Sequence, residues 1–156
     1  YSGMSNPNTS WETCSLRKYL NGPFLQTFFS ERDRARIVPT AIPNPGNMRY
    51  APDKPRRETL DNIFLLSLDE VCKYFGDSTA LLNAEAREWR WIDDENNQNR
   101  IARTLDKNHW WWTRTSGRDQ RWAVNVSFDG VIDPDGLWAN HIDGGVRPAL
   151  WMKIDE

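Results

Sequence analysis

Tryptophan and arginine are concentrated in the last third of the chain. Six of the nine tryptophans lie between His109 and Trp151, among arginine, asparagine and aspartate residues. Tryptophan supplies a large contact area at a small loss of side-chain entropy, and this mixture of residues is typical of recognition surfaces as well as of cores. The chemistry that these residue types favour is noncovalent binding. The question is which tryptophans are buried and which face a partner.

The first candidate contact segment runs from Arg114 to Trp122 and joins two expected strands. Its arginines can bind carboxylates or stack on rings, with Trp122 as an anchor. The alternative is a solvated hairpin loop with Trp122 folded into the core. The candidate ligand-binding residues in and around this segment are Trp112, Arg114, Ser116, Arg118, Asp119, Gln120, Arg121, Trp122, Asn125 and Ser127.

The second candidate segment extends from Asp133 to His141. An exposed Trp138 beside asparagine and histidine can stack on a ring or a sugar face and hydrogen-bond its edges. The alternative is an ordinary turn in which Trp138 caps the sheet. The candidate ligand-binding residues here are Asp133, Asp135, Trp138, Asn140 and His141. Calcium takes about six to eight oxygen ligands, and this segment offers too few carboxylates, so no metal is expected.

Residues for catalytic or cofactor chemistry are sparse. His109 and His141 are the two histidines, and their spacing does not match a metal site, which usually combines several histidines with a carboxylate. Cys14 and Cys72 lie far apart on expected helices, and two buried free thiols are favoured over a bridge between them. Glycine-rich phosphate-binding motifs are absent. We therefore predict no catalytic residues, no metal and no cofactor, and we expect that the chain is not an enzyme.

Length and charge limit the architecture and the partners. The 156 residues are enough for one domain with one core, and residues 1–9 are interpreted as a connector to a domain over 10–156. A net charge of -2 gives no general attraction to nucleic acid. No apolar run approaches the roughly 20 residues of a membrane span, so we expect no membrane insertion. The oligomeric state stays open. Export also stays open, because Tyr1 is not a natural start and the missing leader therefore does not exclude it.

Helical patterns fill the first half of the sequence. Thr9 or Ser10 is expected to cap a helix that ends at residues 21–23, where Asn-Gly-Pro stops it. Ser30 followed by Asp33 resembles an N-cap for a turn over 31–38. The strongest local pattern is a capping box formed by Ser67 and Glu70, which predicts a helix over 68–75. Residues 80–91 are expected to continue helically.

Two segments are predicted to be loops. Residues 39–55 contain several prolines and are predicted to be a long surface loop, and residues 93–100 are predicted to be a polar loop.

The second half of the chain is expected to be rich in strands. The alternation over 122–128 predicts a half-buried strand, and Asp129-Gly130 predicts a hairpin turn. The expected strands are 62–66 and an antiparallel set over 110–115, 122–128, 131–132 and 146–154. Within this last strand Arg147 needs an ion pair or a carbonyl partner, such as Asp69 or Glu70.

Packing of the tryptophans follows from this arrangement. Trp110, Trp111 and Trp151 are expected to fill the core on opposite sides of the sheet. Trp122 and Trp138 are the rings whose burial the pattern leaves open.

Several of these motifs occur in the order found in one bacterial and phage domain family of unknown function, which the chain resembles over about residues 10–152. The family reads approximately WLN, FLLS, WWLRS and GVRPAL. The matching segments here include Phe64-Leu65-Leu66-Ser67, Trp111-Trp112-Thr113-Arg114-Thr115 and Gly145-Val146-Arg147-Pro148-Ala149-Leu150. Thr113 replaces the usual leucine and Thr115 the usual serine of the third motif.

The closing segment is also similar to the last strand of C-type-lectin-like domains, which include formylglycine-generating enzymes and variable proteins diversified by retroelements. This resemblance implies an α+β, C-type-lectin-like fold with two main helices and a small twisted antiparallel sheet. In the diversified relatives the variable residues lie just upstream of the final strand, which here corresponds to about residues 114–141. Formylglycine-generating enzymes place reactive cysteines near the C-terminal end, but no cysteine follows Cys72, so their activity is not implied.

These features lead to one main functional hypothesis and two alternatives. The main hypothesis is a recognition domain that binds a protein or a glycan through a surface over about residues 112–141, located on a bacterial cell surface, extracellularly or on a phage virion. The first alternative is an enzyme of the formylglycine-generating fold. The second is a structural module of a larger surface protein.

Overall fold

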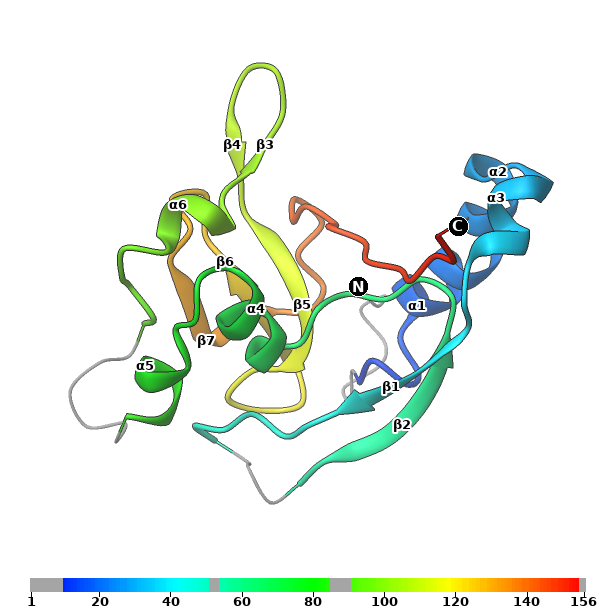
Figure 1. The fold of residues 1–156 in the computed structure, drawn as a ribbon. Helices are drawn as coiled ribbons and strands as arrows, with labels where there is room; N and C mark the ends of the chain where they lie inside the picture. The colour runs from blue at the N-terminus through cyan, green and yellow to red at the C-terminus, as the bar shows by residue number, and fades with distance from the viewer. Residues whose placement is uncertain (1–9, 51–53, 85–90, 155–156) are drawn as a thin grey trace.

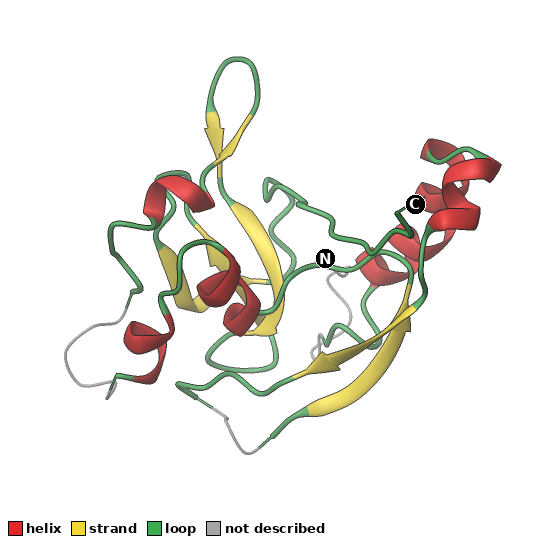
Figure 2. Ribbon diagram, in the orientation of Figure 1, coloured by secondary structure: helices red, strands yellow, loops and turns green. Residues whose placement is uncertain are grey.

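Helices dominate the first part of the chain and the main sheet is formed by the last part (Figures 1 and 2). The computed structural model describes residues 10–50, 54–84 and 91–154. The helices are α1 (Ser15–Tyr19), the π-helix η1 (Leu20–Phe24), α2 (Leu25–Phe28), α3 (Glu31–Arg36), α4 (Leu68–Tyr74), α5 (Thr79–Asn83) and α6 (Asn97–Arg100). The strands are β1 (Thr40–Asn44), β2 (Arg56–Asp61), β3 (Ala102–Arg103), β4 (Asn108–His109), β5 (Trp111–Ser116), β6 (Trp122–Val126) and β7 (Ile132–Trp138). This is a mixed α+β protein with small antiparallel sheets. The expected connector over residues 1–9 lies outside the described residues.

The first helical segment does not end where its sequence predicts. Cys14, rather than Thr9 or Ser10, is the N-cap of α1, and the helix continues through the π-helix η1 into α2. Pro23 lies inside η1. Proline lacks an N–H and its ring meets a carbonyl one turn back in a regular α-helix, so the wider π turn accommodates it. The prediction that residues 21–23 stop the helix is therefore wrong.

Two predicted helix starts are confirmed. Ser30 is the N-cap of α3 and its hydroxyl accepts a hydrogen bond from the Asp33 N–H at 3.1 Å. At the start of α4 the Ser67 hydroxyl accepts from the Glu70 N–H, and the Glu70 carboxylate accepts from the Ser67 N–H at 2.8 Å. This capping box aligns α4 so that Leu68, among other apolar residues, is fully buried.

The long loop predicted over residues 39–55 is wrong for its first part, because Thr40–Asn44 form β1. β1 pairs with β2 in an antiparallel ribbon, in which Thr40 lies opposite Asp61. Pro43 lies within β1 where the register shifts, between Ile42 and Asn44. A two-stranded ribbon consists of edge strands, and a proline is tolerated there because its missing N–H need not pair.

The main sheet is three-stranded, in the order β5-β6-β7, and antiparallel. Its central strand β6 is not half-buried, although the alternation of its residues predicts that it is. Val124 and Val126 pack against α4 and α5 on one face of the sheet. Ala123, on the other face, packs in a second core with Trp11 and the residues that follow β2. Both faces are thus covered. The hairpin turn predicted at 129–130 is confirmed, since the Ser127 N–H donates to the Val131 carbonyl at 2.7 Å.

Residues 145–152 do not form the expected strand. They pair with other parts of the chain only through isolated β-bridges. These bridges join Gly145 to Trp111, Ala149 to Phe64 and Met152 to Ile37. The predicted strand over 62–66 is likewise reduced to the bridge at Phe64. Because this C-terminal segment lies across the outside of the molecule (Figure 1), it does not bury Trp151, which is 56% exposed. The prediction that Trp151 fills the core is wrong, whereas Trp111 is buried as expected.

Arg147 uses a carbonyl partner, but a different one from those predicted. Its guanidinium donates to the Arg100 carbonyl at 3.2 Å and lies over the rings of Phe75 and Trp111, at 4.6 and 5.2 Å from their centroids. Glu70, one of the expected partners, is bound instead by Arg114. Stacking on two rings thus replaces the ion pair expected for a partly buried arginine.

Two further local predictions fail or cannot be followed. The stretch over 93–100 is predicted to be a polar loop, but it contains α6. The helix is held in place by the buried guanidinium of Arg100, which donates hydrogen bonds to the Asp94 carboxylate, to the Ser78 hydroxyl and to the Gly130 carbonyl. In the expected helix over 80–91, α5 ends at Asn83, and residues 85–90 lie outside the described part of the chain.

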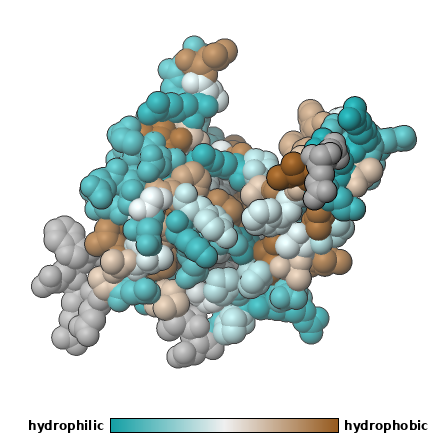
Figure 3. Space-filling view, viewed as in Figure 1, coloured by the Kyte–Doolittle hydropathy of each residue, from teal (hydrophilic) through white to brown (hydrophobic). Residues whose placement is uncertain are grey.

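The face of the molecule shown in Figure 3 is mostly hydrophilic. Hydrophobic residues appear there at the tip of the β3–β4 hairpin, where Leu105 is exposed, and around α2 and α3, where Phe28 is exposed. No helix within the described residues has the length and hydrophobicity needed to cross a membrane.

Candidate functional site

The loop between β5 and β6 is fixed to β7 by backbone hydrogen bonds. The Arg118 N–H donates to the Asp135 carbonyl, and the Ala139 N–H donates to the Arg121 carbonyl, each at 2.9 Å. Within the loop, the Trp122 N–H donates to the Asp119 carbonyl at 3.2 Å. The loop therefore lies on the sheet along its length, and its side chains project from a backbone that is held in place.

Four side chains of this region form a continuous stack, which we call the Trp–Arg stack: Arg118, Trp122, Trp138 and Arg121. Trp122 and Trp138 are opposite one another in the register of β6 and β7, and their ring centroids are 5.5 Å apart. The Arg118 guanidinium lies 3.9 Å from the Trp122 ring centroid, and the Arg121 guanidinium lies 5.0 Å from that of Trp138. Trp138 is 44% exposed, so the stack is a surface feature.

Asp119 holds one end of the stack in place. Its carboxylate accepts hydrogen bonds from the Arg121 N–H at 2.8 Å and from the Arg121 guanidinium at 2.9 Å. The hydrogen bond from Arg121 lowers the pKa of Asp119 below its usual value, so the pair stays charged at neutral pH. The stack therefore presents the positive charge of Arg118 and the Arg121–Asp119 ion pair beside two tryptophan rings.

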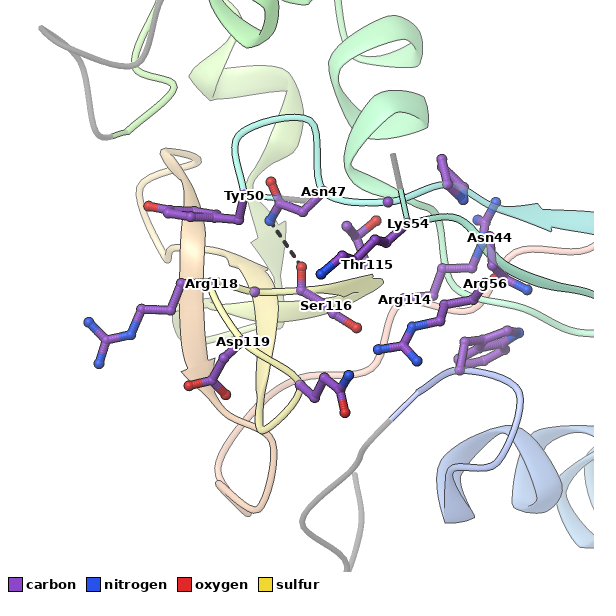
Figure 4. A pocket seen from close by; sticks show the side chains of 15 residues that line it. Asn44, Asn47, Tyr50, Lys54, Arg56, Arg114, Thr115, Ser116, Arg118 and Asp119 are labelled. Carbon is purple, nitrogen blue, oxygen red and sulfur yellow. Dashed lines mark hydrogen bonds between the residues drawn. The ribbon is translucent and has the colours of Figure 1, made fainter. Parts of the chain in front are cut away.

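A pocket of about 210 Å³, whose lining residues are drawn in Figure 4, shares Arg118 with the stack. We call it the basic pocket. Its floor is organised by Asn47, whose side-chain amide donates to the carbonyls of Ser116 and Pro134, both at 2.9 Å. The residues that line it are Trp11, Asn44, Pro45, Gly46, Asn47, Tyr50, Lys54, Arg56, Arg114, Thr115, Ser116, Gly117, Arg118, Asp119 and Gln120.

Positive charge prevails in the lining of this pocket. Lys54, Arg56, Arg114 and Arg118 contribute four cations, and Asp119 contributes the one carboxylate. In Figure 4 the side chains of Arg118 and Asp119 project away from Lys54, which leaves the lysine and Arg56 as the cations at the mouth.

The structure brings seven of the predicted site residues together. Five belong to the Trp–Arg stack or hold it, and two line the basic pocket: Arg118, Asp119, Arg121, Trp122, Trp138, Ser116 and Gln120. Both open alternatives for the tryptophans are thus decided by the fold, since Trp138 is exposed and Trp122 is only partly buried.

Three predicted contact residues are buried, and this is a correction. Trp112 lies in the core beside Trp110, Asn125 lies in the covered central strand, and Asp135 is 5% exposed in β7. A ligand cannot reach these side chains without opening the fold. The residues 133–135 also form part of β7 and are not a turn.

Arg114 is likewise buried and has a structural role. Its guanidinium binds the Glu70 carboxylate and donates to the carbonyls of Leu65 and Pro43, the latter at 2.8 Å. Arg114 also belongs to the lining of the basic pocket, but its charge is already paired with that of Glu70.

The remaining predicted residues lie away from the stack or at its margin. Ser127 and Asp133 are half-buried towards the other end of the sheet, near the hairpin turn. Asn140 and His141 are exposed and follow Trp138, and the His141 ring is 6.3 Å from that of Trp110.

Sequence reasoning missed the half of the pocket that comes from residues 44–56. Asn44, Asn47, Tyr50, Lys54 and Arg56 were expected in a surface loop or among dispersed charges. The paired asparagines of a proline-rich stretch were the available signal, because such side chains often satisfy backbone groups. Within the described residues, no group of three or more histidine, cysteine, aspartate or glutamate side chains is placed to hold a metal ion.

Comparison with known proteins identifies the family of this chain. A domain family of unknown function (DUF6273) matches residues 1–154, which include all the ordered motifs noted in the sequence. No curated protein and no solved structure shows significant similarity to the chain. The match extends over nearly the whole chain, and the protein therefore belongs to the DUF6273 domain family.

Proposed function

We propose that this domain recognises a protein ligand through the Trp–Arg stack. The observation that carries the proposal is the stack itself: two partly exposed tryptophans and two arginines, ordered by ring contacts on a hydrogen-bonded loop. Tryptophan and arginine are the residues most often found at the energetic centres of protein interfaces. A stack that is ordered before binding also loses little side-chain entropy when a ligand arrives.

The geometry favours a protein over a glycan. A sugar binds tryptophan by lying on a ring face, but guanidinium groups already lie over the rings of Trp122 and Trp138. What the stack offers instead is ring edges and hydrogen-bond donors of Arg118 and Arg121. Carboxylates and backbone carbonyls of a protein surface match these groups.

We further propose that the fold is C-type-lectin-like and that the domain acts as a non-enzymatic module on a cell surface or virion. The early helices, the small antiparallel sheet and the sequence of the closing segment over 145–150, although it forms no strand, support this proposal. Hypervariability confined to residues 114–141 among sibling sequences would support diversification by a retroelement. Uniform sequence over that window would count against it.

The experiment compares selection by the wild-type domain and by variants from a displayed random peptide library. We expect the wild type to enrich peptides that contain acidic and aromatic residues. Trp138→Ala with Arg118→Ala is expected to abolish this enrichment, because one of the two rings and one of the two guanidinium groups of the stack are removed. Unfolding by urea checks that the variant remains folded.

Trp151→Ala is the matched control, because Trp151 is also an exposed tryptophan but lies on the C-terminal segment, away from the stack. Its selection should equal that of the wild type. Enrichment that survives loss of the stack, or specific binding to a glycan array with no peptide enrichment, would contradict the proposal.

A further inference from the structure

We infer that the basic pocket receives a side-chain carboxylate from the protein ligand that the stack binds. The inference rests on the proposed function and names a second contact for the same ligand. It is carried by three features of the pocket: cations without an ion-pair partner among the described residues, one buried donor of a lining residue that lacks a partner, and a volume that suits a side chain.

The cations at the mouth have no counter-ion in the described structure. Lys54 and Arg56 form no ion pair with any described residue, whereas the neighbouring Arg57 is 3.9 Å from Glu12. The charge of Arg114 is balanced by Glu70, and that of Asp119 by Arg121. Among the described residues of the lining, Lys54, Arg56 and Arg118 therefore have no ion-pair partner, although Arg118 lies over the Trp122 ring, and an anion is the complement that these cations attract.

One buried donor of a lining residue also lacks a partner. The Nε of Arg114 forms no hydrogen bond with any described residue, and Arg114 is only 4% exposed. Buried donors are rarely left unpaired, so a ligand or water oxygen is expected beside this Nε.

The volume of the pocket suits an amino-acid side chain better than a whole small molecule. At about 210 Å³ the pocket is smaller than the roughly 300 Å³ at which sites for complete small-molecule ligands begin. A carboxylate with one or two methylenes fits this space. The β5–β6 loop borders both the pocket and the stack, so one protein surface can contact both.

The test is a titration followed by two-dimensional ¹H–¹⁵N NMR at constant ionic strength, with acetyl-tetraglutamate amide as the probe and acetyl-tetraglutamine amide as the neutral comparison. We expect saturable shifts of the Ser116, Gly117 and Arg118 amides with the glutamate peptide alone. Lys54→Gln with Arg56→Gln should weaken binding by about tenfold or more, because two charge-assisted hydrogen bonds are lost.

Arg57→Gln is the matched control, since it removes one charge from the same strand but outside the pocket lining. It should bind the glutamate peptide as the wild type does. Equal binding by the double variant, equal binding of the glutamine peptide, or tighter binding of inorganic phosphate than of the glutamate peptide would overturn the inference. If the pocket fails in this way while library selection through Trp138 persists, the proposed function stands without it.

Discussion

Arg114 on β5 binds Glu70 in the first turn of α4, with Nη2 and Oε1 3.2 Å apart and a second contact through Nη1. The same Glu70 carboxylate closes the capping box with Ser67. One ion pair therefore ties the main sheet to the start of the helix that covers it.

Arg114→Ala should destabilise the domain strongly, because it leaves the partly buried Glu70 carboxylate without its partner and frees the Leu65 and Pro43 carbonyls. The expected loss in the free energy of unfolding is roughly 3 kcal/mol or more. Urea unfolding followed by tryptophan fluorescence measures it. Arg118→Ala is the control and should stay within about 0.5 kcal/mol of the wild type, because its side chain is exposed. Equal stabilities would refute this role of Arg114.

Gly136→Ala should also destabilise the fold. Gly136 has φ +81°, and an added Cβ would lie 2.2 Å from the Ala123 carbonyl oxygen, so the strain falls on backbone that cannot move aside. We expect a loss of about 1–3 kcal/mol. In contrast, Gly22 in η1 has open space around it, and Gly22→Ala should leave stability unchanged or raise it by up to about 1 kcal/mol. Thermal unfolding of both variants tests the contrast, and a reversed order would contradict it.

Asp135→Asn should gain stability relative to the wild type as the pH rises. Burial raises the pKa of Asp135 above its unfolded value, while Arg49 acts in the opposite direction. Stability from this group is thus fully present below the unfolded pKa and is lost as the pH rises through the higher folded pKa. The asparagine does not ionise, so the difference between the two proteins should grow over this acid range and then level off. Unfolding curves from about pH 3 to about pH 7 measure this, and a difference that shrinks with pH would be the contrary result.

Neither thiol should react in the native protein. Burial raises the pKa of Cys72 to about 12 and also raises that of Cys14. Both are free and buried, so the thiolate is scarce and inaccessible. Titration with a disulfide reagent at about pH 8 should give slow labelling of the folded chain and two rapid equivalents after denaturation. Rapid labelling of the native chain would contradict this prediction and would support the enzymatic alternative.

Features that depend on a few adjacent residues were predictable. The capping box of Ser67 and Glu70, the cap at Ser30 and the turn at 129–130 each follow from local hydrogen bonds that those residue types form in most contexts. The prediction that Cys14 and Cys72 are buried free thiols is confirmed as well.

Features that depend on distant partners were not predictable. β1 exists because β2 pairs with it, despite Pro43, and β6 is buried on both faces because residues before and after β2 pack on one side and α4 on the other. The last segment was expected to be a strand, but it meets three different elements in turn. The alternating pattern of a strand shows which of its residues are apolar, but it does not show whether one or both faces of the sheet are covered by other elements.

The sequence by itself determined the mixed α+β class, the helix starts at Ser30 and Ser67 and the concentration of tryptophan and arginine after residue 109. The tertiary structure alone decided that Trp122 and Trp138 meet arginines at the surface, while Trp112 is buried and Lys54 and Arg56 flank the same loop. The physical reason is that exposure and charge pairing are properties of neighbours in space, and most of these neighbours are more than ten residues apart along the chain.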